Sequence, residues 1–179
     1  MKATRSLLAA MVLGTAIGAS QANAQCSSGT GSCFTTNTAS VTVGVLVKLG
    51  MTTTTTALTA PSVTDLESAT PVLDNVGPVF TVKANRSWNL KIKSFNATNF
   101  DYTGSDLGVK PIGDLSWAIS SGGSYSAITA SDATVASGVS SNGTTVNSFF
   151  RTSWAGGFSA ASNAPGTYSL PIVFTLTAP

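Results

Sequence analysis

Val79–Ser94, with the sequence VFTVKANRSWNLKIKS, is the stretch that decides the fold class. Apolar residues fill most of its even positions, whereas Thr, Asn and Lys fill most of the odd ones. The apolar set is Phe80, Val82, Ala84, Trp88, Leu90 and Ile92. Alternation with a period of two, rich in β-branched and aromatic residues, is typical of strands with one face buried and one face in water. The stretch therefore predicts two half-buried strands, with Trp88 in the core.

The same parity constrains the connection between these two strands. In a simple hairpin the apolar residues must face one another, which places Ala84 opposite Trp88 and Val82 opposite Leu90. Asn85-Arg86-Ser87 then forms a three-residue loop, because a two-residue loop would put the apolar sets on opposite faces. The alternative is a strand pair that crosses between two sheets, to which this register does not apply.

Two further stretches alternate over a comparable length. Val41–Met51 has six consecutive odd positions that are apolar, and Thr167–Thr177 has apolar residues at its even positions. Pro171 requires that the second stretch be an edge strand or lack a ladder bond. Leu58–Gly77 is expected to be a loop with one short edge strand, and Asn142-Gly143 predicts a tight turn.

About eight or nine strands, with turns roughly every ten residues and no amphipathic helix, predict an all-β protein. We expect a single antiparallel, immunoglobulin-like β-sandwich over residues 39–179. A closed barrel is the alternative. No internal repeat is visible, so one domain is expected.

The N-terminus has the features of an export signal. Lys2 and Arg5 precede the short apolar run Leu7–Ile17, and Ala22-Asn23-Ala24 matches a signal-peptidase site. We therefore expect residues 1–24 to be a signal peptide, residues 25–38 a flexible segment, and the protein to be secreted, periplasmic or on a bacterial cell surface. The apolar run is too short to span a bilayer, and no later stretch predicts a transmembrane segment.

The cysteine and histidine content limits the chemistry. The two cysteines, Cys26 and Cys33, are expected to form a disulfide in an oxidising compartment. The chain has no histidine, so His-based triads and the usual zinc sites cannot be built. Two carboxylate pairs remain, Asp65 with Glu67 and Asp101 with Asp106, and we expect both to solubilise loops. The protein is expected to be non-enzymatic, with no metal and no cofactor.

Charge adds one candidate surface. Without Lys2 and Arg5, the nine basic residues fall to seven, equal to the seven acidic residues, so nucleic-acid binding is not expected. Positive charge is concentrated at Lys83, Arg86, Lys91 and Lys93. It suggests either an anion-binding face or the ordinary protection of strand edges by lysine. Trp154 abuts Gly156-Gly157 and is the tryptophan expected to be exposed. With loop aromatics, it would serve an alternative function as a monomeric carbohydrate-binding module.

The leader, the early Val-rich strand, the central AN-x-x-W-x-L motif and the closing PGTYSLPIVFTLTAP together resemble secreted bacterial β-sandwich proteins. Pilin-like subunits and proteins of the spore coat protein U type are the families they resemble. The resemblance implies a surface or fibre subunit whose partners are copies of itself or other surface subunits. In pilins an alternating N-terminal extension completes the sheet of a neighbour. Val41–Met51 would be such a donor, and Thr167–Thr177 the acceptor edge or the last strand.

Overall fold

The computed structural model describes residues 37–69 and 72–179. The chain divides into two compact units, Met1–Thr42 and Val43–Pro179. Residues 37–42 carry no helix or strand, and all the elements described below lie in Val43–Pro179. The predicted signal peptide and the cysteines Cys26 and Cys33 lie outside the described residues.

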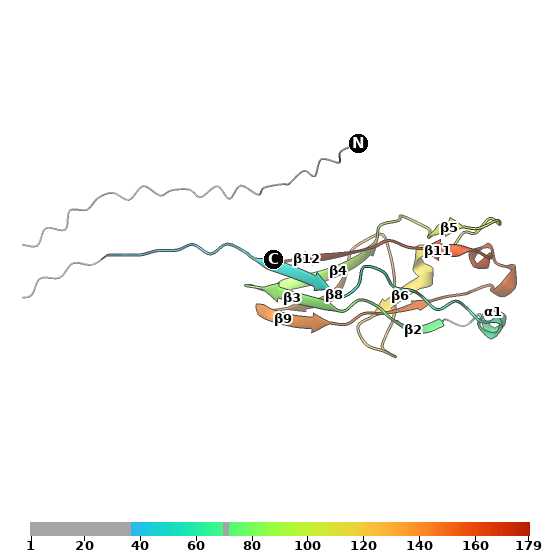
Figure 1. The fold of residues 1–179 in the computed structure, drawn as a ribbon, viewed down its shortest axis with the longest axis horizontal. Coiled ribbons are helices and arrows are strands. Elements are labelled where there is room, and N and C mark those ends of the chain that lie inside the picture. Colours follow the sequence, from blue (N-terminus) through green and yellow to red (C-terminus); the bar gives the residue numbers. More distant parts are fainter. Residues whose placement is uncertain (1–36, 70–71) are drawn as a thin grey trace, which may run out of the picture. The chain divides into compact units, whose positions relative to one another are not determined.

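Val43–Pro179 is built mainly of β-strands in antiparallel sheets (Figure 1). The described part contains twelve strands: β1 (Val47–Met51), β2 (Val72–Val76), β3 (Phe80–Ala84), β4 (Trp88–Ser94), β5 (Asp101–Thr103), β6 (Leu115–Ala118), β7 (Ser126–Ala127), β8 (Ala133–Gly138), β9 (Ser141–Val146), β10 (Phe149–Thr152), β11 (Thr167–Ser169) and β12 (Ile172–Thr177). One short helix, α1 (Val63–Ser68), and three 3-10 turns complete it: η1 (Ile112–Asp114), η2 (Gly157–Ser159) and η3 (Ala161–Asn163). The strands exceed the expected number because β5, β7 and β11 are only two or three residues long.

The strands form four open sheets. Their orders are β1-β3-β9, β2-β10-β6-β7, β12-β4-β8 and β11-β5, and every pair is antiparallel. In Figure 1 the start of β1, the β3–β4 connection and the C-terminus lie at one end of Val43–Pro179, which we call the base. Helix α1 and the β5–β11 pair lie at the opposite end, which we call the far end.

β3 and β4 belong to different sheets, so the predicted hairpin register is wrong and the crossing alternative is correct. β3 pairs with β1 and β9, whereas β4 pairs with β12 and β8. The even residues of both strands nevertheless enter one core, as the alternation predicts, and none is more than 7% exposed. Parity places both apolar sets on the core side in either arrangement, and therefore it could not decide between them. The connection is Asn85-Arg86-Ser87, as expected.

Two local predictions also fail. Residues 58–77 contain α1 besides the edge strand β2, and its start is marked by a capping box in which Ser62 Oγ accepts from Asp65 N (3.2 Å) and Asp65 Oδ2 accepts from Ser62 N (2.7 Å). Asn142-Gly143 is not a turn but lies within β9, where Gly143 has a φ of +153° beside an irregularity in the β3–β9 register. The chain instead reverses at Val139-Ser140, between β8 and β9.

Candidate functional site

The two strands nearest the chain ends, β1 and β12, are both sheet edges. β1 hydrogen-bonds to β3 alone, and β12 hydrogen-bonds to β4 alone. The two strands nevertheless lie next to one another. Their facing edges therefore carry backbone donors and acceptors that no strand among the described residues satisfies. The predicted strand Thr167–Thr177 is divided at Leu170-Pro171 into β11, which pairs with β5, and the edge strand β12, so Pro171 lies between two strands rather than within one.

An apolar groove opens beside these edges, past the end of β1 and along the start of β12. It has a volume of about 650 Å³ and is lined on one side by Met51 and residues 53–58 and on the other by Tyr168–Ile172 and Phe174. Core side chains form its floor: Pro78, Phe100, Leu115 and Phe150. We call this feature the edge groove. It exposes the interior of the domain between the first half of β12 and the segment that follows β1.

Residues that line the edge groove are held by aromatic contacts. The rings of Phe80 and Phe174 lie 4.4 Å apart between centroids, which attaches β12 to β3 across the core. Toward the far end, Tyr168 lies against Tyr102, with centroids 4.9 Å apart. Tyr168 Oη donates to Ala164 O (2.9 Å), and burial together with Tyr102 raises the pKa of its hydroxyl. The groove wall is therefore preformed along its length.

β1 is continued toward the base by a side chain rather than by a strand. Asn85 N donates to Leu46 O (3.2 Å), Asn85 Oδ1 accepts from Leu46 N (2.9 Å), and Asn85 Nδ2 donates to Gly44 O (2.8 Å). The valines within and upstream of this contact are exposed: Val45, between Gly44 and Leu46, by 55%, and then Val43 by 69% and Val41 by 88%. The stretch Val41–Met51 is thus divided, because Val47–Met51 belongs to the chain's own sheet and only residues up to Leu46 lie outside it.

Trp154, which the sequence places at the surface, is buried and 8% exposed. Lys110 Nζ lies 4.0 Å from the centroid of the Trp154 ring, and it also donates to Asp114 Oδ2 (3.1 Å) and Ser153 O (2.6 Å). Burial lowers the pKa of Lys110, while the hydrogen bond and the charge of Asp114 act in the opposite direction. This cluster anchors the end of β10, and the sugar-stacking surface that the carbohydrate-binding alternative needs is not formed by Trp154.

The four basic residues of the predicted anion face are not brought together. Lys83 lies on β3 and Arg86 in the connection that follows it, whereas Lys91 and Lys93 lie on β4 in another sheet. Because both strands turn their even residues inward, their lysines point away from the shared core on its two sides. Lys93 also pairs with Asp132 at 3.6 Å.

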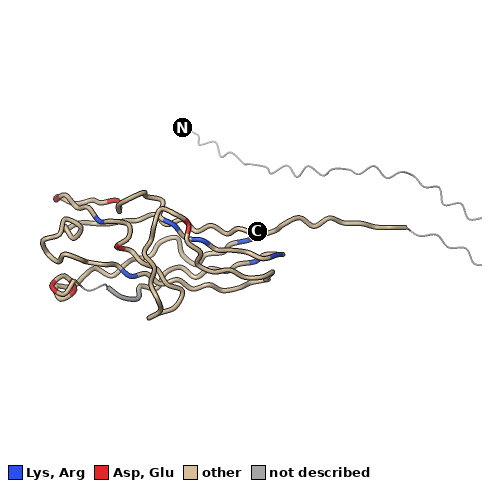
Figure 2. Tube along the Cα trace, turned by 180° about the vertical axis from the view of Figure 1, so that it is seen from behind, with Lys and Arg blue, Asp and Glu red and all other residues tan. Residues whose placement is uncertain are grey.

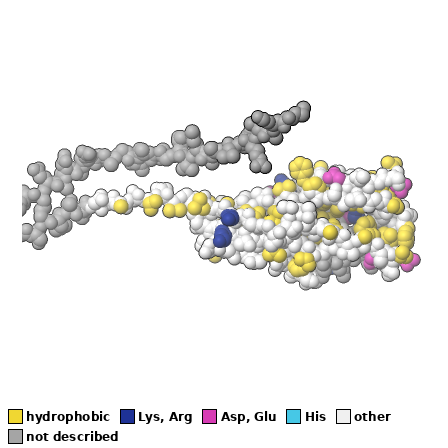
Figure 3. Space-filling view, in the orientation of Figure 1, with side chains coloured by type: hydrophobic (Ala, Val, Ile, Leu, Met, Phe, Trp, Pro, Cys, Tyr) yellow, Lys and Arg dark blue, Asp and Glu magenta, His cyan; other side chains and the backbone are white. Residues whose placement is uncertain are grey.

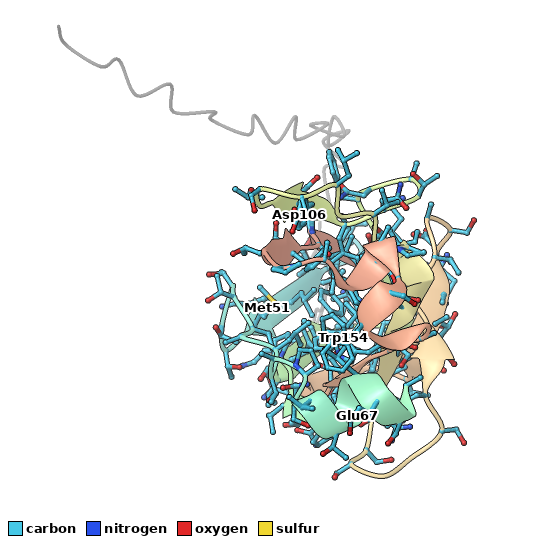
Figure 4. All side chains as sticks on the ribbon, turned by 90° about the vertical axis from the view of Figure 1, so that its right-hand side faces the viewer. Met51, Glu67, Asp106 and Trp154 are labelled. Atoms are coloured by element: carbon cyan, nitrogen blue, oxygen red, sulfur yellow. The ribbon has the colours of Figure 1, made fainter. Side chains whose placement is uncertain are left out.

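The carboxylates considered from sequence lie at the far end. Asp65 and Glu67 lie on α1 rather than on a strand, and Asp65 caps that helix. Asp101 Oδ1 accepts from Asn96 Nδ2 (3.1 Å). Figure 4, which looks onto the far end, shows Glu67 and Asp106 on opposite sides of Trp154. Within the described residues, no three acidic, histidine or cysteine side chains gather as a metal-binding group.

Comparison with protein-family models, with curated proteins and with solved structures found no match for this chain. Among the helices of the described residues, none has the length and apolar character needed to cross a membrane.

The edge groove is the candidate functional feature, and the sequence located it only in part. Its two walls fall in or beside the stretches singled out by their alternation, Val41–Met51 and Thr167–Thr177. Its floor comes from residues far apart in the sequence, such as Phe100 and Phe150, whose convergence no local pattern indicates.

Proposed function

We propose that this chain is an exported, non-enzymatic structural subunit of a bacterial surface layer or fibre, and that copies assemble by strand complementation. In this proposal the domain is an immunoglobulin-like β-sandwich that lacks one strand, and a segment from another copy supplies it. The observation that carries the proposal is the edge groove, because its apolar floor opens beside the unpaired edge of β12 and at the end of the unpaired edge of β1. A strand laid in it and continued along these edges would satisfy their backbone groups and cover the core.

The incomplete cover of the core supports this reading. The inward residues of β12 all remain partly exposed, namely Ile172, Phe174 and Leu176, and Leu49 of β1 is also only partly buried. On β3 and β4 the corresponding residues are fully buried. Apolar surface left open along one line favours burial by a further strand, at about 25 cal/mol for each Å² covered.

The segment upstream of β1 has the properties of such a strand. Val41, Val43 and Val45 alternate with Thr42 and Gly44, so one face of an extended segment would be β-branched and apolar. These valines are exposed in the isolated chain. The donor is therefore shorter than Val41–Met51, since its second half already forms β1.

Export is consistent with the proposal on sequence grounds. The leader-like residues 1–24 direct a chain out of the cytoplasm, and the low charged fraction of 9% suits a protein that associates through β-edges rather than one kept apart by charge. The localisation that follows from the proposal is the periplasm and then the cell surface.

The test compares the exported chain with a variant that lacks residues 25–46 and so keeps every described strand. We expect the full chain to give a heat-sensitive ladder on unheated gels and the deletion variant to stay monomeric, soluble and able to bind a synthetic peptide of residues 37–46. The matched control peptides carry Val41→Ser and Val43→Ser, which should abolish binding, or Thr42→Ser, which should not. The proposal would be overturned if the full chain were monomeric and the deletion variant did not bind the peptide.

A further inference from the structure

Exposed charge is distributed unevenly along Val43–Pro179, with the exposed basic residues at the base and most exposed acidic residues at the far end. Figure 2 shows blue positions at the tips of the strands near the C-terminus and red positions at the opposite end, where some blue positions also lie. The basic set at the base is Lys48, Lys83 and Arg86, all exposed. The acidic set at the far end is Glu67, Asp101 and Asp106, also exposed and in addition to the helix cap Asp65. In a chain with only 9% charged residues, this separation gives the domain two ends of opposite sign.

The base contains a pair of like charges in direct cross-strand register. Lys48 of β1 is the register partner of Lys83 of β3. Like charges directly opposite one another destabilise a sheet. Neither lysine has a carboxylate partner among the described residues, whereas Lys93 and Lys110 each have one. The pair therefore costs stability in the isolated domain and leaves two cations available to an anionic group.

The surface around this pair is shaped to receive such a group. Lys48 and Lys83 line a shallow depression of about 500 Å³, together with the polar side chains of Asn85, Ser141 and Asn142. The space-filling view shows the dark blue side chains near the start of β1 and the magenta ones toward the other end (Figure 3). The side-chain amide of Asn142 beside two lysines favours a carboxylate, whereas Asn85 already donates to Gly44 O.

We propose that the basic base of one copy binds the acidic far end of the next, so that Lys48 and Lys83 contact a carboxylate such as Glu67 or Asp106 of a second copy. This inference rests on the proposed function and adds the orientation of assembly to it. The occupant is a second copy because the chain itself carries the complementary charge, at the end that a head-to-tail array would present.

Strand direction makes the two arrangements distinguishable. β12 runs toward the base, where Thr177 pairs with Asn89 near the start of β4, and β1 runs away from the base. A donor segment leads directly into β1 at the base of its own domain. If it lies antiparallel to β12, it leaves the edge groove at the far end, and the donor's base meets the acceptor's acidic end. If it lies parallel to β12, two lysine-bearing bases meet and repel. The charges therefore select the antiparallel donor.

The effect is expected on the rate of assembly more than on the stability of the assembled product. Exposed ion pairs contribute little to stability, whereas complementary end charges speed encounter and orient it. At about 0.1 M salt such forces are screened beyond roughly 10 Å. Elongation should therefore slow as ionic strength rises.

The experiment measures the elongation rate of the purified exported chain at low and high ionic strength. Lys83→Glu should slow elongation on the order of tenfold at low salt and abolish its salt dependence. Its matched control is Lys91→Glu, which makes the same charge change on β4 and should leave the rate near that of the parent chain. Folding of Lys83→Glu is not at risk, because the change removes a repulsive pair.

Two further arms separate this inference from the strand-exchange proposal. The double variant Glu67→Lys, Asp106→Lys should slow elongation as Lys83→Glu does. A chain that combines Lys83→Glu with Glu67→Lys and Asp106→Lys should regain the elongation rate of the parent chain. Binding of the 37–46 peptide should be equal in all variants, because the peptide lacks the basic end of the domain that carries Lys48 and Lys83. Equal elongation rates for Lys83→Glu and Lys91→Glu, with peptide capture intact, would overturn the charged junction alone. Loss of both assembly and peptide capture in the parent chain would overturn the proposed function.

Discussion

β4 and β12 are adjacent strands of one sheet and present apolar residues to the same core, yet the core covers them differently. Leu90 of β4 is 0% exposed, while its direct cross-strand partner, Leu176 of β12, is only partly buried. β4 has a neighbour on each side, whereas β12 has one. The comparison shows that alternation gives a strand its inward face, and that the number of in-sheet neighbours decides how completely this face is covered.

The same contrast holds between β3 and β1. Val82 of β3 is 0% exposed, and its register partner Leu49 of β1 is partly exposed. The less covered members belong to β1 and β12, the two edge strands that lie next to one another without pairing. Two partly covered strands that share one opening make a site, whereas either one alone would be an ordinary sheet edge.

The largest expected effect on stability comes from truncating Leu90, and truncating its cross-strand partner Leu176 tests the comparison. Leu90→Ala should lower the free energy of unfolding by about 3 to 4 kcal/mol, because it leaves a cavity in closed core. Leu176→Ala should cost about 1 to 2 kcal/mol, since part of the side chain is already in water. Urea unfolding of both variants, monitored by tryptophan fluorescence, measures the two values.

Binding of the 37–46 peptide should reduce the difference between the costs of Leu90→Ala and Leu176→Ala in free energy of unfolding. A strand that continues from the edge groove along the free edge of β12 would cover Leu176, so the cost of Leu176→Ala should rise when the peptide is present, while that of Leu90→Ala stays constant. Equal costs for the two variants in the free domain would mean that β12 is as well covered as β4, and the incomplete cover of the β12 edge would not support strand addition.

The next effect concerns a charge buried in the closed part of the domain. Asp114→Asn keeps an oxygen near Lys110 Nζ but removes the negative charge, so it should cost about 2 kcal/mol near pH 7. Burial lowers the pKa of Lys110 below 10.5, so the folded state binds fewer protons than the unfolded state between these two pKa values. The free energy of unfolding therefore rises with pH across that window and falls as pH drops through the folded-state pKa.

Removing Asp114 lowers the pKa of Lys110 further, because Asp114 was raising it. The cost of Asp114→Asn should therefore shrink as pH approaches 10.5, and the measurement is denaturant unfolding of both chains over pH 7 to about 10. Asp132→Asn is the control, since its partner Lys93 is partly exposed in the 3.6 Å pair and the cost should be under about 1 kcal/mol at any pH. A pH-independent cost for Asp114→Asn would show that Lys110 is not held charged by this contact.

The sequence predicts this fold well wherever one residue's environment follows from its neighbours in the chain. The inward sides of β3, β4 and β12 follow from alternation, whereas Pro171, which precedes β12, left open the choice between an edge strand and a missing ladder bond. Strand partnership does not follow in this way. Parity is satisfied whether β3 and β4 pair or face one another across a core, and only their other neighbours, β1, β9, β12 and β8, decide it.

At Trp154 and Asn142-Gly143, a local sequence signal gave a wrong prediction because residues distant in the chain decide the structure there. Gly156-Gly157 beside Trp154 suggested exposure, but Lys110, more than forty positions earlier, covers the ring. Asn-Gly is a turn signal only when its two flanking strands pair with each other, and β9 continues through it because it pairs with β3. The capping box at Ser62 is local, and the short helix it begins was therefore within reach of the sequence.

The smallest expected effect on stability tests where β1, which belongs to the sheet, ends and the segment with the exposed valines begins. Asn85→Ala removes the side-chain bonds to Leu46 N and Gly44 O and should cost about 1 kcal/mol.

The more telling readout for Asn85→Ala is amide hydrogen exchange. Exchange at Leu46 should quicken while exchange within Lys48–Met51 stays slow, because the β1–β3 ladder is untouched. Asn147→Ala, at another exposed asparagine, should change neither. If Asn85→Ala instead freed the whole of β1, the strand would depend on that one side chain. The donor segment would then extend to Met51, and the division between a closed core and an open edge would have to be drawn at β3.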